Sequence, residues 1–189
     1  MVYLPIYLVV AIFLGVGSWQ LVVWLGEVLD KNRKFKAASA YASEKNKPML
    51  VAGGPWGNKS ARRWLNIPAH GSGDVCLDIN RRPIHGHPCA VIATVTDIPF
   101  RHKSFGAVFA SHLLEHLPTV ADAERALAEL DRVAEAVYIA FPSRQSIAGW
   151  LTPGHHLQVW QKNGTTFLKQ RGRSGAESGR SITIEPAGE

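Results

Sequence analysis

The chain begins with a long apolar segment that restricts the possible folds more than any other feature. From Val2 to Gly26 no side chain carries a charge. A helix that is apolar on all sides must lie in a bilayer or inside a large protein, because it has no face to turn to water. About 20 apolar residues are enough to cross a bilayer. Trp19 and Trp24 lie toward the C-terminal end of the segment, where aromatic rings favour the interface. The sequence therefore predicts a transmembrane helix over residues 1–29, with a buried helix of a soluble protein as the alternative.

Basic residues follow the apolar segment and predict its orientation. They are Lys31, Arg33, Lys34 and Lys36. Basic side chains next to a span stay on the cytoplasmic side, so we expect a single-pass membrane protein with a cytoplasmic C-terminal domain and the lipid bilayer as a partner. A cleaved signal peptide is disfavoured, because no Lys or Arg precedes the run and the run exceeds about 7–15 residues. Residues 30–47 are predicted as a basic juxtamembrane linker or helical stalk.

Short apolar runs alternate with helix-like segments over residues 48–170, and this region is predicted to be one folded domain. Strands that alternate with helices or long crossovers indicate a parallel sheet with helices on both faces. The predicted fold class is α/β, a doubly wound, mostly parallel, Rossmann-like sheet that is abbreviated at its C-terminal end. Residues 171–189 are rich in Gly, Ser, Arg and Glu and are predicted to be a disordered tail. The predicted strands are 49–53, 75–79, 89–95, 107–111 and 136–141, and the predicted helices lie around 61–65 and over 120–135.

The residues that follow each predicted strand form the candidate site, because ligands of such sheets bind at the carboxyl ends of the strands. Glycines after the first strand let a ligand approach the backbone closely. A carboxylate after the second strand suits the two hydroxyls of a ribose, and an acid with an apolar neighbour after the third could flank an adenine ring. No phosphate-binding lysine motif accompanies them, so the set describes an adenosine pocket without phosphate. The candidates are Gly53, Gly54, Gly57, Asp78, Asp97, Ile98, Ser111 and His112.

Two stretches of the domain are similar to a known family. The segment TDIPFRHKSFGAVFASHLLEHLP, residues 96–118, resembles the class I S-adenosylmethionine-dependent methyltransferases, in particular the group called type 11. The segment ALAELDRVAEAVYIAFPS resembles the next helix and fifth strand of that group. The resemblance implies S-adenosylmethionine as the cofactor. It also implies roles by position: Gly53, Gly54 and Gly57 on the methionine side, Asp78 at the ribose, Asp97 and Ile98 at the adenine, and Ser111 and His112 facing the sulfonium.

The predicted function is a membrane-anchored methyltransferase for a lipid-soluble or membrane-associated acceptor, which could be a small molecule, a lipid or a membrane protein. The sequence assigns no catalytic residue, although His112 and His116 are the nearest candidates for a base. The chain departs from the family pattern at Val51, Pro55 and Gly106. These departures motivate the alternative, a non-catalytic methyltransferase-like binding or scaffold module at the membrane. The sequence leaves open whether the protein is an enzyme.

One short motif suggests a metal site of a different kind. His112-Leu113-Leu114-Glu115-His116 fits H-x-x-E-H, a zinc-protease motif. That chemistry needs both histidines on one helix and a third ligand downstream, whereas this motif follows a predicted strand. His85-Gly86-His87-Pro88-Cys89 is interpreted as a polar loop, and His155-His156 as facing either water or the candidate site. The sequence therefore predicts no bound metal.

The distribution of charge bears on whether a nucleic acid binds, and the number of cysteines bears on whether disulfides form. The formal net charge is +6, but the basic residues are divided between the juxtamembrane segment, the pairs at 62–63 and 81–82, and the tail. Anionic lipid headgroups explain the first group directly, so no nucleic acid partner is expected. The two cysteines are too few for a disulfide framework, and reduced thiols in a cytosolic domain are the simpler interpretation.

Overall fold

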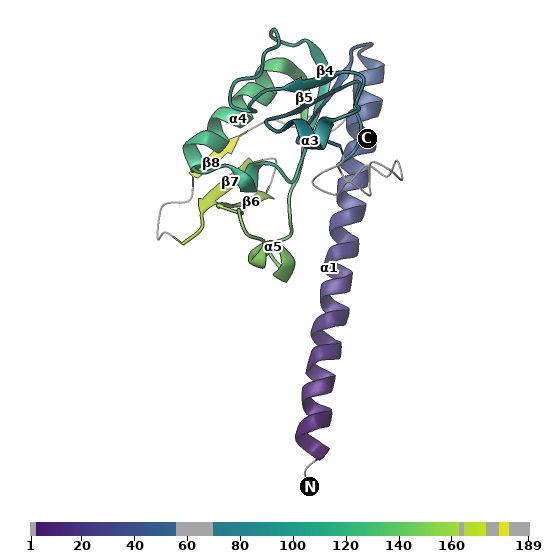
Figure 1. Ribbon diagram of the computed structural model, residues 1–189, viewed down its shortest axis with the longest axis vertical. Helices are drawn as coiled ribbons and strands as arrows, with labels where there is room; N and C mark the ends of the chain where they lie inside the picture. The colour runs from purple at the N-terminus through teal and green to yellow at the C-terminus, as the bar shows by residue number, and fades with distance from the viewer. Residues whose placement is uncertain (1–2, 56–69, 163–164, 173–177, 182–189) are drawn as a thin grey trace.

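A single long helix begins the chain. The structure is a computed structural model that describes residues 3–55, 70–162, 165–172 and 178–181. Helix α1 (Tyr3–Glu44) has 42 residues without a break, which corresponds to about 63 Å at 1.5 Å per residue. Figure 1 shows its N-terminal half standing clear of the folded domain, which gathers around its C-terminal half. Within the described residues, α1 is the one helix that is long and apolar enough to cross a membrane.

A five-stranded parallel sheet forms the centre of the domain. Its strands lie in the order β3-β2-β1-β4-β5, and every neighbouring pair is parallel. This is a strand order of doubly wound sheets, and it confirms the predicted fold class. The central strands β1 and β4 are buried throughout, as expected where helices cover both faces. The strands are β1 (Met49–Ala52), β2 (Val75–Asp78), β3 (Ala90–Ile92), β4 (Phe105–Ser111) and β5 (Ala134–Ala140).

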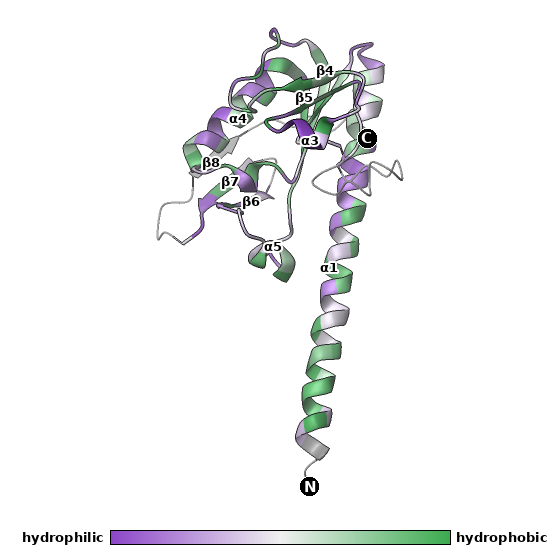
Figure 2. Cartoon of the chain, viewed as in Figure 1, coloured by the Kyte–Doolittle hydropathy of each residue, from purple (hydrophilic) through white to green (hydrophobic). Residues whose placement is uncertain are grey.

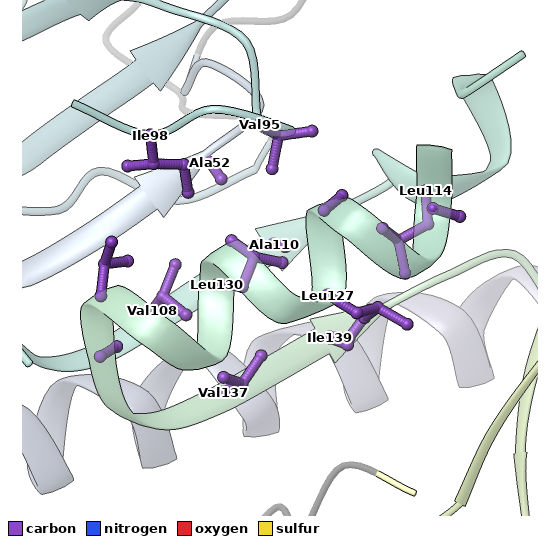
Figure 3. Close-up of a cluster of buried hydrophobic side chains, with 14 of the residues drawn as sticks. Ala52, Val95, Ile98, Val108, Ala110, Leu114, Leu127, Leu130, Val137 and Ile139 are labelled. Carbon is purple, nitrogen blue, oxygen red and sulfur yellow. The ribbon is translucent and has the colours of Figure 1, made fainter. Parts of the chain in front are cut away.

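Helix α4 (Val120–Val133) covers one face of this sheet. Thr119 caps its first turn, where the threonine hydroxyl accepts a hydrogen bond from Asp122 N at 3.1 Å. The apolar face of the helix repeats every three or four residues, and Leu127 and Leu130 on that face are fully buried against the strands. Figure 3 shows these side chains meeting Val108 and Ile139 of the sheet. Burial of each leucine stabilises the fold by about 1.5–3 kcal/mol.

The last turns of α1 cover the opposite face. Ala38, Tyr41 and Ala42 are buried in a second core cluster with residues of β1, β4 and β5, and the ring of Phe35 meets that of Phe109 edge to face at 5.4 Å. The structure therefore differs from the predicted linker over residues 30–47. Residues 30–44 belong to α1, and Ala38, Tyr41 and Ala42 among them are part of the core, because the apolar face of the sheet on that side needs a covering layer.

Side-chain hydrogen bonds also join α1 to the loop after β5. Gln20 Nε2 donates to Gln145 O at 3.0 Å, and Gln20 Oε1 accepts from Ile147 N at 2.9 Å. About two helical turns further along α1, Glu27 Oε1 accepts a hydrogen bond from Ser143 N at 2.7 Å. The domain thus contacts α1 from residue 20 onward, inside the predicted span of residues 1–29. Figure 2 shows the apolar colouring concentrated in the part of α1 that precedes these contacts.

A smaller antiparallel sheet completes the structure. It contains β6 (Leu157–Lys162), β7 (Thr165–Gln170) and β8 (Ser178–Ser181) in that order, and the short helix α5 (Ile147–Leu151) precedes it. Strand β8 pairs with β7, so part of the predicted disordered tail is instead a strand. The backbone hydrogen bonds of an added edge strand do not require an apolar sequence, which explains why composition did not predict it. The predicted helix around residues 61–65 lies outside the described residues.

Candidate functional site

The carboxyl ends of β1, β2 and β4 lie level with one another. Ala52 pairs with Leu77 of β2 and with Ala110 of β4. The next residues on these strands are Gly53, Asp78 and Ser111. Gly53 N donates to Leu77 O at 2.9 Å, and the φ angle of Gly53 is +93°, which favours glycine. The structure therefore brings together three of the predicted site residues.

The other predicted glycines have different surroundings. A Cβ atom at Gly54 would collide with Pro83 Cβ and would lie 2.9 Å from Pro83 O. Pro83 belongs to the short helix α3 (Arg81–Ile84), so Gly54 allows α3 to pack against the β1 turn. In this structure Gly54 serves that close packing, and Pro83 fills the space beside it. Gly57 lies outside the described residues.

Asp78 is half-buried at the end of β2. Its Oδ1 accepts a hydrogen bond from Asn80 N at 2.7 Å. Burial raises the pKa of the Asp78 carboxyl above its ordinary value, and the bond from Asn80 opposes this effect in part. In the described part of the chain Asn80 is the only hydrogen-bond donor to this carboxylate. Asp78 can therefore accept further hydrogen bonds, as a ribose diol requires.

Asp97 and Ile98 occupy the turn that follows β3, and the structure separates their roles. Asp97 is exposed, as a residue that contacts a ligand can be. Ile98 is only 2% exposed and packs in the core with Leu130 of α4. Ile98 therefore anchors the turn from below, and its burial leaves little of its side chain to cover an adenine ring.

A charged pair on α4 holds this turn in place. Glu129 Oε2 accepts from Ile98 N at 2.8 Å, while Arg132 donates to Ile98 O at 2.8 Å and to Phe100 O at 2.7 Å. The two side chains also bond to each other, with Arg132 Nε 2.7 Å from Glu129 Oε1. The hydrogen bond from Arg132 lowers the pKa of the Glu129 carboxyl. Nothing in the sequence distinguishes Glu129 and Arg132 from an ordinary i, i+3 pair on a helix surface.

Ser111 ends β4 and His112 follows it, and both lie beside a third residue that was not predicted. Ser111 is buried, and its Oγ lies 3.3 Å from Nδ1 of His70. The rings of His70 and His112 are 5.7 Å apart. His112 has a φ of +50°, which is uncommon for a residue with a side chain and typical of functional turns. His70 has no motif around it, so nothing in the sequence signalled that it would lie at this edge.

The turn after His112 brings a further cluster together. Residues Leu114–His116 form a short 3-10 helix, η1. Its position is fixed from the residue before β6, because His156 N donates to Glu115 O at 2.7 Å. Ligand atoms of Glu115, His116 and His155 all lie within 4.8 Å of one another. The motif at residues 112–116 and His155 are far apart in the sequence, and the packing of η1 against β6 brings them together.

The histidines of this cluster are oriented by backbone carbonyls. His155 Nδ1 lies 2.9 Å from Gly149 O, and His116 Nδ1 lies 3.2 Å from Gly154 O. Burial lowers the pKa of His155, and the charges of His116 and Arg171 act in the same direction against that of Glu115. Glu115 and His155 also line a pocket with Ser143, Arg144, Trp150 and Arg171.

The loop at residues 85–89 has its own hydrogen bonds. His87 Nε2 lies 3.0 Å from Gly73 O, and His87 Nδ1 accepts from Cys89 N at 3.2 Å. One ring nitrogen is therefore engaged within the loop and the other with the segment before β2, in agreement with the interpretation of residues 85–89 as a polar loop. Cys76 and Cys89 are free thiols, and burial raises the pKa of Cys76 to about 11.

These features define a class of protein. A parallel sheet in this strand order, a glycine turn after β1 and a carboxylate at the end of β2 are the arrangement of a Rossmann-like domain that binds a nucleoside. Residues 69–136 match the family model described as a methyltransferase domain. The match confirms the resemblance seen in the sequence: this part of the chain is similar to methyltransferase domains, and S-adenosylmethionine is the cofactor that the family supports.

Solved structures of low sequence identity resemble the chain. An S-adenosylmethionine-dependent methyltransferase from Clostridium acetobutylicum is 9% identical, with a TM-score of 0.40, and the match covers 72% of this chain and 61% of that one. An amino pentose methyltransferase from Micromonospora echinaspora, solved with S-adenosylmethionine bound, is 13% identical with a TM-score of 0.38, covering 74% of this chain and 61% of that one. A sugar N-methyltransferase from Streptoalloteichus is 13% identical with a TM-score of 0.39, covering 82% and 73%.

The fold assignment rests on strand order and register rather than on these similarities. This chain spans less than two thirds of the length of the Clostridium enzyme, since the match covers 61% of it. No significant match to the chain was found among curated proteins.

The residues present fit the cofactor in part. Asp78 offers a carboxylate at the position of the ribose, and the positive φ of Gly53 lets the backbone face a ligand. Asp97 follows β3 and His112 follows β4, at the same edge of the sheet but with β2 and β1 between these two strands. Gly54 and Ile98 are committed to packing. The residues that would hold the cofactor are therefore Gly53, Asp78, Asp97, Ser111 and His112.

Proposed function

We propose that the protein is a membrane-anchored methyltransferase that uses S-adenosylmethionine to methylate a lipid-soluble or membrane-associated acceptor. The observation that carries the proposal is the half-buried carboxylate of Asp78, level with Gly53 and Ser111 on adjacent parallel strands. The Asp78 carboxylate accepts hydrogen bonds from the ribose hydroxyls, and the Asp97 carboxylate accepts one from the adenine amine. When bound, the cofactor supplies a methyl group that the sulfonium has already activated. The protein therefore mainly has to align the acceptor with it.

The apolar half of α1 supports the membrane part of the proposal. Its side chains are exposed over several turns, among them Phe13 at 73% and Leu14 at 67%, and water would disfavour such a surface. Residues 31–36 supply basic side chains next to the apolar half, which favours a domain on the cytoplasmic side. Tethering raises the local concentration of the enzyme near acceptors that partition into the same membrane.

The helix α5 adds a second exposed apolar surface, close to the point where α1 leaves the domain. Trp150 is 49% and Leu151 is 75% exposed, and α5 begins one residue after Ser146, close to the contacts that Gln20 makes with Gln145 and Ile147. Trp and Leu on a short exposed helix favour the interfacial region of a bilayer. We infer that α5 lies at the headgroup level beside α1.

Titration of the full chain in detergent micelles with S-adenosylmethionine and with its demethylated product tests the proposal. Hydrogen bonds to a charged group contribute about 1.5–3 kcal/mol each, and 1.4 kcal/mol is a factor of about ten. Asp78→Ala should therefore weaken binding at least about tenfold. Asp97→Ala should weaken it less, because only one contact is lost.

Asp131→Ala is the matched control. Asp131 is an exposed acid on α4 whose side chain pairs with Lys103, and its removal should leave cofactor affinity unchanged. Circular dichroism checks that each variant is folded. Equal binding by wild type and a folded Asp78→Ala variant would show that the site lies elsewhere.

The alternative function is a non-catalytic binding module at the membrane. Pro83 beside Gly54 favours this alternative, because it fills space next to a glycine on the methionine side of the predicted site. The same titration separates the two functions. If the wild-type chain binds neither compound at millimolar concentration, the enzyme proposal is wrong and the binding module takes its place.

Protease protection on sealed vesicles tests the topology. Vesicles whose cytoplasmic face points outward should leave the domain open to digestion. A domain that is shielded in such vesicles would contradict the proposed orientation.

A further inference from the structure

The side chain of Glu115 is buried without a hydrogen-bond partner. It is 3% exposed, and neither carboxylate oxygen receives a hydrogen bond from the described residues. Nδ1 of His112 lies 3.3 Å from Glu115 Oε1, but the angles are not those of a hydrogen bond. A buried carboxylate that receives no hydrogen bond is costly, and such a group in a native fold requires an explanation, of which an ion is one.

Two histidines next to this carboxylate have the tautomer that suits a metal ligand. A backbone carbonyl can only accept a hydrogen bond, so the contacts to Gly149 O and Gly154 O place a proton on Nδ1 of His155 and His116. The lone pair of each neutral ring is then on Nε2. Metal-binding histidines commonly donate their other ring N–H to a backbone carbonyl or carboxylate in this way.

The spacing of the three groups is close to that of a metal site. Their ligand atoms lie within 4.8 Å of one another. Ligands about 2.0–2.1 Å from a tetrahedral metal are about 3.3 Å apart, so side-chain movements of about 1 Å would close the site. The backbone around it is held by the bond from His156 N to Glu115 O and by Arg171 N, which donates to His156 O at 2.9 Å.

We propose that Glu115, His116 and His155 bind a divalent first-row transition metal, with Zn²⁺ as the first candidate. Two imidazoles and one carboxylate, without a thiolate, form a set that suits such ions rather than Ca²⁺ or Mg²⁺. Three protein ligands leave a fourth position for water or another oxygen ligand. Glu115 and His155 both line the pocket described above, so that ligand can enter from the pocket. The inference does not depend on methyl transfer.

The site differs from that of a zinc protease, although it shares two residues with the H-x-x-E-H motif. The motif requires two histidines one helical turn apart, whereas η1 is a three-residue 3-10 turn and His112 precedes it in a left-handed conformation. His112 lies beside the carboxylate but outside the three-residue cluster. No local pattern in the sequence joins His155 to this motif, and only the fold brings it in as the third ligand from another part of the chain.

Metal binding to the full chain in detergent micelles tests the proposal. The purified protein is stripped with a chelator and titrated with Zn²⁺ alone, with metal content measured after equilibrium dialysis, and with Co²⁺ alone, with visible absorption as the readout. We expect one metal per chain, a visible Co²⁺ band of low-coordinate type, and a higher midpoint of thermal unfolding with metal present.

Three variants remove the ligands singly. His155→Ala, His116→Ala and Glu115→Gln should each weaken metal binding at least about 100-fold, and should lose the metal-induced rise in the unfolding midpoint. His156→Ala is the matched control, because its side chain is exposed and its role at the site is through its backbone N–H. It should bind metal as the wild type does.

The outcomes distinguish a specific metal site at these three residues from non-specific binding at the surface. A wild type without a stoichiometric metal overturns the proposal, and so does an equal loss of affinity in His156→Ala and His155→Ala. If a ligand variant fails to fold, the Co²⁺ band of the wild type decides: a spectrum of the hexaaquo ion overturns the proposal, and a low-coordinate band supports it.

Discussion

Asp78 makes the proposed cofactor site sensitive to pH. Burial raises the pKa of its carboxyl above the ordinary value of about 3.9. Only the carboxylate can accept both hydrogen bonds from a diol. Cofactor affinity should therefore be constant at neutral pH and should fall as the pH is lowered through the raised pKa, by about tenfold for each pH unit below it.

Calorimetric titration from neutral to acidic pH measures this dependence, with circular dichroism to check the fold. Asp78→Asn should bind more weakly and should lose the acidic step, while Asp97→Asn should keep it. An acidic step of the same size in Asp78→Asn would mean that another group titrates.

Gly106 allows close packing between the sheet and α1. A Cβ atom at this position would lie 2.8 Å from Ala42 Cα and 3.2 Å from Ala42 O, both part of a rigid helix backbone. Gly106→Ala should therefore lower the free energy of unfolding by about 1–3 kcal/mol, as measured by urea denaturation. His102→Ala, an exposed change in the preceding turn, should stay within about 0.5 kcal/mol of the wild type. An unchanged midpoint in Gly106→Ala would mean that α1 can shift away from the sheet.

Single residues also mark where the sequence was informative. Asp78 was predicted at the site because it ends an apolar run, and strand ends can be read from such runs. Ile98 was predicted to face a ligand but is buried, because the turn after β3 is pulled onto α4 by bonds that start 31 residues further along the chain. His70 and His155 reach the site through tertiary packing alone, which leaves no local pattern.

At the level of elements, α4 controls the geometry of the turn after β3. Arg132 donates to two carbonyls of that turn, and Glu129 accepts from Ile98 N. Arg132→Ala should lower stability by about 1–3 kcal/mol, a range that allows for the partial exposure of the arginine. It should also weaken cofactor binding, because Asp97 loses its support.

Arg125→Ala is the comparison for this change, since Arg125 is exposed on the same helix. Urea denaturation and cofactor titration should detect little change in it. The Glu129 carboxyl has a lowered pKa, so the stability that it contributes is complete above its ordinary pKa and is lost as the pH falls through the lowered one. A wild type and an Arg132→Ala variant of equal stability at neutral pH would contradict the role of the pair.

The elements of the main sheet could be predicted, and those of the second sheet could not. Buried parallel strands are continuous apolar runs, and all five predicted strands appear, although the third shortens from 89–95 to Ala90–Ile92. Strands β6 and β7 contain many polar residues and bury only alternate side chains.

At the level of the whole molecule, the two ends of α1 have different surroundings: the N-terminal part stands outside the domain and the C-terminal part lies in its core. Its residues up to Trp19 precede the first side-chain bond to the domain, which Gln20 makes, whereas Ala38, Tyr41 and Ala42 are in the core. A chain without residues 1–19 should therefore fold and unfold cooperatively. A chain without residues 1–46 should not, because one face of the sheet loses its cover.

Near-ultraviolet circular dichroism and urea denaturation compare the two shortened chains. Cooperative unfolding of the shorter chain at the wild-type midpoint would contradict the role of α1 in the core. Loss of structure in the longer chain would show that the apolar half is needed for folding as well.

The unbroken course of α1 has a consequence for how the protein would sit at a membrane. Because α1 is one rigid helix, the tilt of its membrane-inserted half also determines the orientation of the domain. A thicker or thinner bilayer that changes this tilt would therefore move the carboxyl edge of the sheet toward or away from the lipid surface. The rotation of the domain about the helix axis is also fixed by α1, because one added residue would turn the helix by about 100°. A lipid composition that alters thickness would thus set which acceptors the carboxyl edge of the sheet can reach.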